Sequence, residues 1–107
     1  MDIKCYKKGL KYVVWDFIEN IDSNQDKRKI IKDLDRLQNE DLEKLLKVEV
    51  VKKLEDNLYE LRPYDIRIFF IVFKDAYYLL HIIRKKRKKI PSKDLNIARK
   101  RKKEIII

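Results

Sequence analysis

The sequence predicts a single α+β domain in which two helices precede a mainly antiparallel sheet and a basic helix follows it. Three observations lead to this prediction. Apolar residues recur at helical spacing from residue 10 to about residue 39, and from residue 58 the spacing changes to that of strands. The length also fits, because 107 residues, 45% of them hydrophobic, can bury one modest core. We therefore expect one domain over residues 1–107.

The N-terminal half predicts helices after a short strand. Residues 2–6 fit an edge strand, and apolar residues recur every three or four positions from Leu10 to Ile21, which is typical of an amphipathic helix. Ser23 followed by Asp26 resembles a capping box, so a second helix should run to about Asn39. The short connection predicts an antiparallel helix hairpin that packs on one face of the sheet. The expected inner side of the second helix is Ile30, Ile31, Leu34 and Leu37.

The next segments change from helical to strand spacing. Leucines in residues 42–46 fit a short helical turn, whereas residues 48–54 are ambiguous. Residues 58–62 alternate, and residues 66–73 form an apolar run that suits a central strand covered on both faces. Residues 76–83 fit a third strand. Because the connections between these strands are tight, we expect an antiparallel meander.

The C-terminal segment combines a cationic run with a last helix. Six cations, Arg84 to Lys89, follow the third strand directly. Pro91 and Ser92 then offer a helix start, and Leu95 and Ala98 mark a weak inner side. This helix should be basic and should lie on the face or the edge of the sheet that the helix hairpin leaves open.

Positive charge is concentrated in that segment. Residues 1–83 carry 16 Lys/Arg and 16 Asp/Glu, whereas residues 84–107 carry 12 Lys/Arg and two acidic residues, so the whole net charge of +10 lies there. A concentrated block of cations favours binding of a polyanion, because phosphates relieve the repulsion within the block. The alternative is a solvated charged tail.

Two arginines flank the first predicted turn between strands. Arg62 precedes the turn and Arg67 follows it, so paired strands would place the two side chains next to each other. Their guanidinium groups could then hold one phosphate by paired hydrogen bonds. A surface ladder of charges with Glu60, which is on the same face as Arg62, explains the pattern equally well.

Several common site chemistries are missing from the sequence. His81 is the only histidine and Cys5 the only cysteine, so neither a zinc site nor a disulfide within the chain is expected. Gly9 alone cannot make a glycine-rich phosphate loop. For His81 in its apolar strand, a structural role is favoured over acid–base catalysis. Without a leader sequence or a long apolar run, we expect a cytoplasmic protein that makes no membrane contact.

A series of short motifs over residues 57–104 has the order and spacing of a known family. The motifs are Leu58-Tyr59-Glu60-Leu61-Arg62, Arg67-Ile68-Phe69-Phe70, Leu79-Leu80-His81, Lys85-Lys86 with Lys89 and Pro91, and Ala98 with Arg101. This series resembles the RelE/HigB superfamily, in its branch of phage-derived small proteins, and the helix hairpin upstream fits the same RelE-like fold. Two departures are Ile82-Ile83, in place of a glycine and an aromatic residue, and Arg87-Lys88, in place of a hydroxyl residue and glutamine.

The resemblance implies a function and a set of partners. It implies a ribosome-dependent mRNA endonuclease, the toxin of a type II toxin–antitoxin module, in which the ribose 2′-OH attacks the scissile phosphate without a metal or another cofactor. The implied partners are the ribosome with its mRNA and a cognate antitoxin, often a helix-turn-helix protein through which alone operator DNA is contacted. A non-catalytic RNA- or DNA-binding protein that uses the same basic segment is the alternative, and a module that docks on an acidic protein is a third possibility.

The resemblance also implies roles for residues. Arg62 and Arg67 match its basic positions and would hold the scissile phosphate, while Lys85 and Lys86 match its paired lysines. These lysines would bind flanking phosphates, and one could take part in proton transfer. Tyr64 would stack on a base by position rather than by motif. The cationic run supplies the remaining predicted RNA-binding residues: Arg84, Arg87, Lys88 and Lys89.

Overall fold

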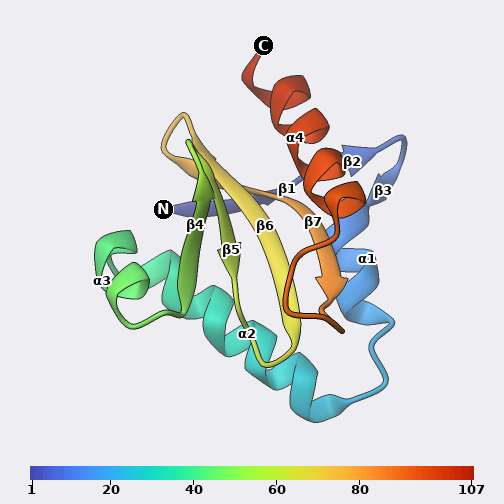
Figure 1. Cartoon of the computed structure of the whole chain (residues 1–107), viewed down its shortest axis with the longest axis vertical. Helices are drawn as coiled ribbons and strands as arrows, with labels where there is room; N and C mark the ends of the chain where they lie inside the picture. Colours follow the sequence, from blue (N-terminus) through green and yellow to red (C-terminus); the bar gives the residue numbers. More distant parts are fainter.

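A five-stranded sheet forms the centre of the computed structural model, which describes all 107 residues (Figure 1). From one edge to the other the strands are β1 (Asp2–Cys5), β7 (Ala76–Arg84), β6 (Ile66–Phe73), β5 (Leu58–Leu61) and β4 (Val51–Glu55). Neighbouring strands are antiparallel except β1 and β7, which are parallel. The predicted meander β5-β6-β7 is therefore confirmed, and β4 and β1 extend it on either side.

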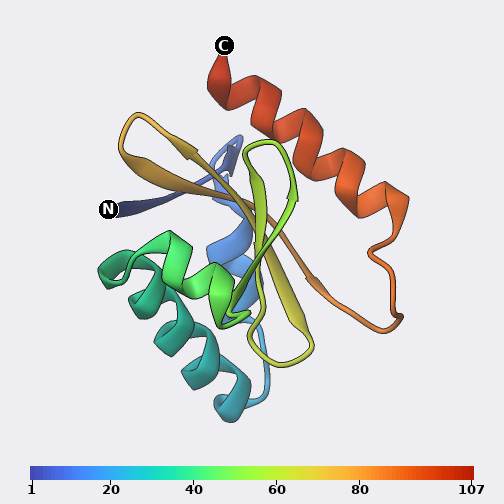
Figure 2. The same ribbon diagram turned by 60° about the vertical axis from the view of Figure 1, so that its left-hand side comes forward.

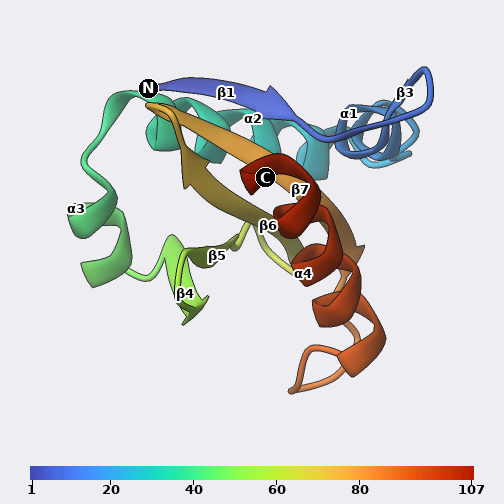
Figure 3. The same ribbon diagram turned by 90° about the horizontal axis from the view of Figure 1, so that it is seen from above.

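Helices cover both faces of this sheet. They are α1 (Val13–Glu19), α2 (Asn24–Asn39), α3 (Leu42–Lys47) and α4 (Ser92–Ile106). Figure 3 shows α1 and α2 on one side of the sheet and α4 on the other. The segment between β7 and α4 loops out beside the end of the sheet (Figure 2). The expected α+β architecture with a basic last helix is thus confirmed.

None of these helices combines the length and the apolar character that crossing a membrane would require.

Strand β6 is buried on both faces. Ile66, Ile68 and Phe70 point toward the side of α1, α2 and α3, whereas Phe69 and Ile71 point toward α4. All five are fully buried. The long apolar run therefore behaves as the central strand that the sequence predicts, because each side of its period-2 alternation has its own helical layer to bury it.

A β-bulge interrupts the pairing of β6 with β7. Phe69 pairs with His81 and Phe70 with Leu79, so Leu80 has no partner of its own. The extra residue keeps His81 on the α4 side, where its ring stacks on Phe69 with a centroid distance of 5.8 Å. From there its Nε2 lies 2.8 Å from Oδ1 of Asp94 at the start of α4.

The predicted start of the first helix is wrong. A two-residue hairpin, β2 (Lys7–Lys8) with β3 (Lys11–Tyr12), precedes α1, and Leu10 lies at its tip with 93% of its surface exposed. Gly9 turns the chain there with a φ of 61°, a conformation that glycine adopts readily. The helical periodicity is therefore real only from Val13 onward.

Helix α2 begins as predicted but turns one apolar residue outward. Ser23 accepts a hydrogen bond from the Asp26 amide at 3.1 Å, as in a capping box. Ile31, expected inside, is 61% exposed because the buried stripe passes through Ile30 and positions four and seven residues later. The expected helix pair is present, and α1 and α2 diverge from their short connection along the same face of the sheet (Figure 1).

Strand β4 and the start of α4 lie in segments for which the sequence signals are weak. The ambiguous residues 48–54 include most of β4, which pairs antiparallel with β5 and carries an irregularity after Lys53. Helix α4 begins at Ser92, so Pro91 rather than Ser92 occupies the cap position, with no side-chain cap. Its inner side is weak as predicted, because Ala98 is its only fully buried residue.

We expect the stability of the fold to depend on the titration of His81. Burial lowers the pKa of its imidazole below the ordinary value of 6.5, and the Asp94 carboxylate opposes this shift. The unfolded chain therefore binds this proton at a higher pH than the folded chain does. The contribution of the neutral His81 ring to the free energy of unfolding is complete above about pH 6.5. It is lost as the pH falls through the lowered pKa of the folded protein.

Urea denaturation at about pH 7 and about pH 5 measures this effect. The midpoint of the unaltered protein should fall more between the two pH values than that of His81→Gln, whose side chain cannot titrate. Equal falls in the two proteins would show that His81 contributes no pH dependence.

Candidate functional site

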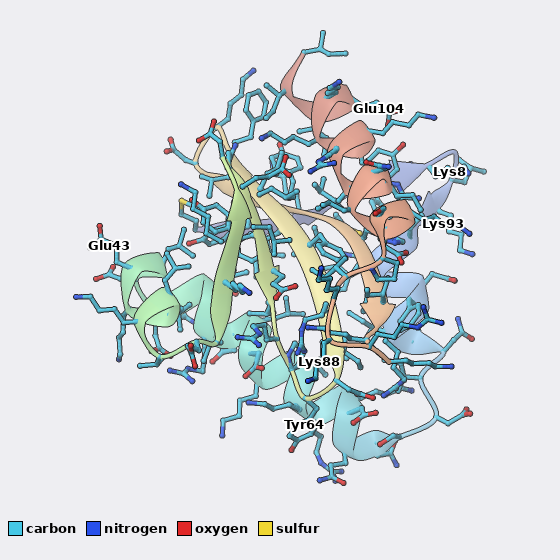
Figure 4. The ribbon with its side chains drawn as sticks, in the orientation of Figure 1. Lys8, Glu43, Tyr64, Lys88, Lys93 and Glu104 are labelled. Carbon is cyan, nitrogen blue, oxygen red and sulfur yellow. The ribbon has the colours of Figure 1, made fainter.

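A cationic pocket opens where the β5–β6 turn meets the loop after β7. It has a volume of ≈ 590 Å³ and is lined by Tyr64, Asp65, Arg67, Lys85, Lys86, Arg87 and Lys88. The Lys85 amide donates a hydrogen bond to the Asp65 carbonyl at 2.6 Å, which fixes the loop to the turn. Figure 4 shows the labelled Tyr64 and Lys88 at this end of the sheet. Two segments that are separate in sequence thus form one site, which we call the loop pocket.

The turn at the loop pocket holds Tyr64 in an unusual conformation. The Ile66 amide closes the turn by donating to the Pro63 carbonyl at 3.0 Å. Tyr64 has a φ of 55°, in the left-handed region that aromatic residues rarely adopt. Its side chain is 52% exposed, and the Lys29 ammonium lies 5.8 Å from its ring centroid. Such backbone strain persists only where surrounding contacts fix it, and functional sites are common places for it.

Arg67 is the buried cation of the loop pocket. Only 8% of its surface is exposed, and its Nη1 donates to the carbonyls of Tyr64 and Ile66, each at 2.8 Å. Burial lowers the pKa of its guanidinium below the ordinary value, and the Glu60 carboxylate only partly opposes this shift. The group nevertheless remains a cation at neutral pH, because an arginine begins far above neutrality. Arg67 therefore presents a fixed positive charge at the floor of the pocket.

Glu60 belongs to this arrangement, although the sequence indicated only a surface ladder for it. Its side chain is buried, and its Oε1 lies 3.6 Å from Nε of Arg62 and 3.9 Å from Nε of Arg67. Glu60 Oε2 and Arg67 Nε are both buried without a hydrogen-bond partner. The signal was the two-residue spacing of Glu60 and Arg62, which puts both side chains on the same side of the chain at the end of β5. The sequence did not show that the Glu60 carboxylate is buried.

The predicted site residues do not all reach the loop pocket. Arg67, Tyr64 and the four cations from Lys85 to Lys88 line it. Arg62 is paired with Glu60 and lines a different hollow, which lies beside β4. Lys89 is exposed in the same loop but outside the pocket lining.

Arg84 is engaged in ion pairs rather than free for a ligand. Its Nη1 lies 2.7 Å from Oδ1 of Asp65, and its Nη2 lies 3.0 Å from Oδ2 of Asp26. These pairs connect the end of β7 to the turn and to the first turn of α2. They raise the pKa of the Arg84 guanidinium. Arg84 is therefore suited to hold the turn and the loop in position and not to bind a ligand.

The electrostatics of the loop pocket favour an anion. Its one carboxylate, Asp65, is already paired with Arg84. The cations Lys85, Lys86, Arg87 and Lys88 make no ion pair within the chain. In addition, no group of three or more His, Cys, Asp or Glu side chains lies together in a way that could hold a metal ion. Uncompensated cations around a hollow attract phosphate groups.

His81 lies outside the loop pocket and connects α4 to the sheet. Besides Asp94, it meets Nη1 of Arg101, which lies 3.5 Å from its Nδ1 and also donates to the Leu80 carbonyl at 2.8 Å. Its side chain is 16% exposed. These contacts agree with the structural role that the sequence favoured.

Comparison with known proteins identifies one family. The model described as phage derived protein Gp49-like (DUF891) matches residues 16–103, which include every residue that lines the loop pocket. No curated protein matches the chain.

We expect Glu60→Gln to destabilise the fold. The amide keeps the size of the side chain but removes the charge between the guanidinium groups of Arg62 and Arg67, which then repel each other. Removing one partner of a buried ion pair costs roughly 3 kcal/mol. Urea denaturation of the purified variant measures the loss of unfolding free energy. Glu43→Gln, at an exposed residue of α3 without an ion pair, is the matched control; a similar effect in both variants would argue against a special role for Glu60.

Proposed function

We propose, because the chain belongs to the family of phage-derived Gp49-like proteins, that it is the toxin of a toxin–antitoxin pair and cleaves mRNA on the ribosome. That family is part of the RelE/HigB-like toxin superfamily. The observation that carries the proposal is the loop pocket, in which Arg67 and four uncompensated cations surround an exposed tyrosine. The site can bind an RNA backbone through its phosphate groups.

The proposed reaction is an internal transesterification of RNA. The ribose 2′-oxygen forms a bond to the adjacent phosphorus, and the bond from phosphorus to the 5′-oxygen breaks. The 2′-OH gives up its proton and the departing 5′-oxygen takes one up, so the products are a 2′,3′-cyclic phosphate and a 5′-OH. The transition state has an additional negative charge on its phosphoryl oxygens, and fixed cations stabilise that charge most effectively.

Arg67 is suited to stabilise that charge. Its Nη1 is anchored by two carbonyls of the turn, so the guanidinium does not have to reorganise when the charge develops. Arg62 contributes indirectly, since it shares the Glu60 carboxylate that keeps Arg67 in place. Direct binding of the scissile phosphate by Arg62 remains a prediction.

Lys85 and Lys86 are suited to the flanking phosphates and the leaving oxygen. Both lie in the loop that is fixed to the turn, and both line the pocket. An ammonium group beside the 5′-oxygen can neutralise its charge or deliver the proton that it needs. Arg87 and Lys88 extend the cationic wall, while Tyr64 offers an exposed ring on which an unstacked base can lie.

The proposed partners follow from the family and the charge. A toxin of this superfamily requires a cognate antitoxin, and we propose a helix-turn-helix protein that alone contacts operator DNA. The ribosome would supply the mRNA in a conformation that enters the loop pocket.

The sharpest test replaces the two lysines of the loop pocket. In a translation reaction with purified protein, Lys85→Ala/Lys86→Ala should lower the rate of mRNA cleavage by about 10²-fold or more, because charge stabilisation in the transition state is lost. Mapping of mRNA 3′ ends, with and without ribosomes, measures cleavage. Neither lysine makes an ion pair, so the fold should be unaffected.

A second prediction concerns growth. Expression of the unaltered chain without its partner should arrest growth, and Arg67→Ala should relieve that arrest.

The matched control is Lys32→Ala/Lys47→Ala, which removes two exposed cations from α2 and α3. It should cleave at the unaltered rate. If both double variants cleave equally well, the loop pocket is not the catalytic site. Salt-sensitive RNA binding without any cleavage by the unaltered protein would instead favour the non-catalytic nucleic-acid-binding function.

A further inference from the structure

A second cationic hollow lies away from the loop pocket, between the β2–β3 hairpin and α4. It has a volume of ≈ 280 Å³ and is lined by Tyr6, Lys8, Ile97, Lys100, Arg101 and Glu104. Figures 1 and 3 show the hairpin projecting beyond the end of β1, next to α4. We call this hollow the hairpin groove. Residues from the two ends of the chain form it together.

The hairpin groove has a fixed floor. The Tyr6 amide donates to the Leu79 carbonyl at 2.8 Å, which continues the pairing of β1 with β7. The Tyr6 hydroxyl donates to a carboxylate oxygen of Glu104, and the Arg101 guanidinium lies 4.8 Å from the Tyr6 ring centroid. These contacts fasten the base of the hairpin to α4, so the two segments that carry the lysines keep a defined relative position.

The lysines of the hairpin groove have no anionic partner. Glu104 is its only carboxylate and is engaged by Tyr6, and neither Lys8 nor Lys100 makes an ion pair. On α4 the exposed residues Lys93, Lys100 and Lys103 recur at intervals of seven and three, so they share the outward face of the helix. The groove therefore opens onto a helix face that carries further lysines.

The composition of the groove favours a phosphate backbone over a protein. The centres of protein interfaces are depleted in lysine and enriched in aromatic and apolar anchors. Here the exposed groups are lysines, while Ile97 is only half-exposed and the Tyr6 hydroxyl is already satisfied. Flexible ammonium groups over a polar floor are instead typical of contacts to nucleic-acid phosphates, which carry most of the affinity.

We propose that the hairpin groove binds the phosphate backbone of a second RNA segment, separate from the strand that enters the loop pocket. The choice of RNA rests on the proposed function, whereas the binding of phosphates rests on the groove itself. Lys100 lies eight residues into α4, about 12 Å along its axis from the helix start. A rigid helix thus separates the two cationic surfaces, and structured RNA that contacts both would hold the enzyme in a fixed orientation.

The test measures binding alone. Lys8→Gln/Lys100→Gln is compared with Lys32→Gln/Lys47→Gln, which removes the same charge from exposed residues of α2 and α3. The probe is a fluorescent RNA hairpin whose 2′-hydroxyls are all methylated, so cleavage cannot occur. Binding is titrated over a range of salt concentrations. For Lys8→Gln/Lys100→Gln, the slope of log K against log salt should become shallower by about 2, one unit for each lost phosphate contact.

The control variant should keep the slope of the unaltered protein. If both variants change the slope equally, or neither changes it, the groove is not a phosphate site and the proposal is overturned. Weakened binding of an acidic partner protein, with RNA binding intact, would also overturn it. The measurement is independent of catalysis, so a chain that cleaves no mRNA can still show the effect, and an active nuclease can still fail to show it.

Discussion

A guanidinium group buried at the start of the central strand sets the local structure around it. Because only 8% of Arg67 is exposed, the fold has to compensate its charge: the Tyr64 and Ile66 carbonyls accept hydrogen bonds from it, and the Glu60 carboxylate lies 3.9 Å away as an opposite charge. The left-handed backbone of Tyr64 accompanies this arrangement, since the turn has to aim its carbonyl inward. One buried charge thus fixes the turn, the exposed ring at its tip and the strand that carries the carboxylate.

Polar contacts fasten α4 to the sheet together with a small apolar set, in which Leu95 and Ile105 pack around the buried Ala98. Only Ala98 is fully buried, while His81–Asp94, Arg99–Glu55 and the Arg101 hydrogen bond to β7 tie the helix along its length. Such contacts are directional, so they fix the helix in rotation and register as well as in distance. The cationic loop before α4 is thereby held at both ends, by the helix start and by its bond to Asp65.

Sequence periodicity predicted the elements well where burial follows one period. Strand β6 and the meander follow from alternation and apolar runs alone. The predictions for Leu10 and Ile31 were wrong because apolar residues at helical spacing need not be buried. Tertiary contacts decide which of them are buried. The candidate site was predicted in part: the arginine pair and the lysine pair were visible as residue types. The depth of Glu60 and the ion pairs of Arg84 were not, because they depend on contacts between elements distant in sequence.

Counting charge along the chain also conceals how charge is arranged in space. Residues 1–83 are neutral in sum, yet Lys8 comes from a hairpin that lies against α4, whereas the acidic residues that balance the count are spread over other elements. The structure therefore joins Lys8 to the C-terminal block and divides the block itself between a loop and a helix face. A surface of this kind can contact one polyanion at two places. Charge that is fixed at two separated places can read the relative position of two phosphate strands, which a flexible tail of equal charge cannot do.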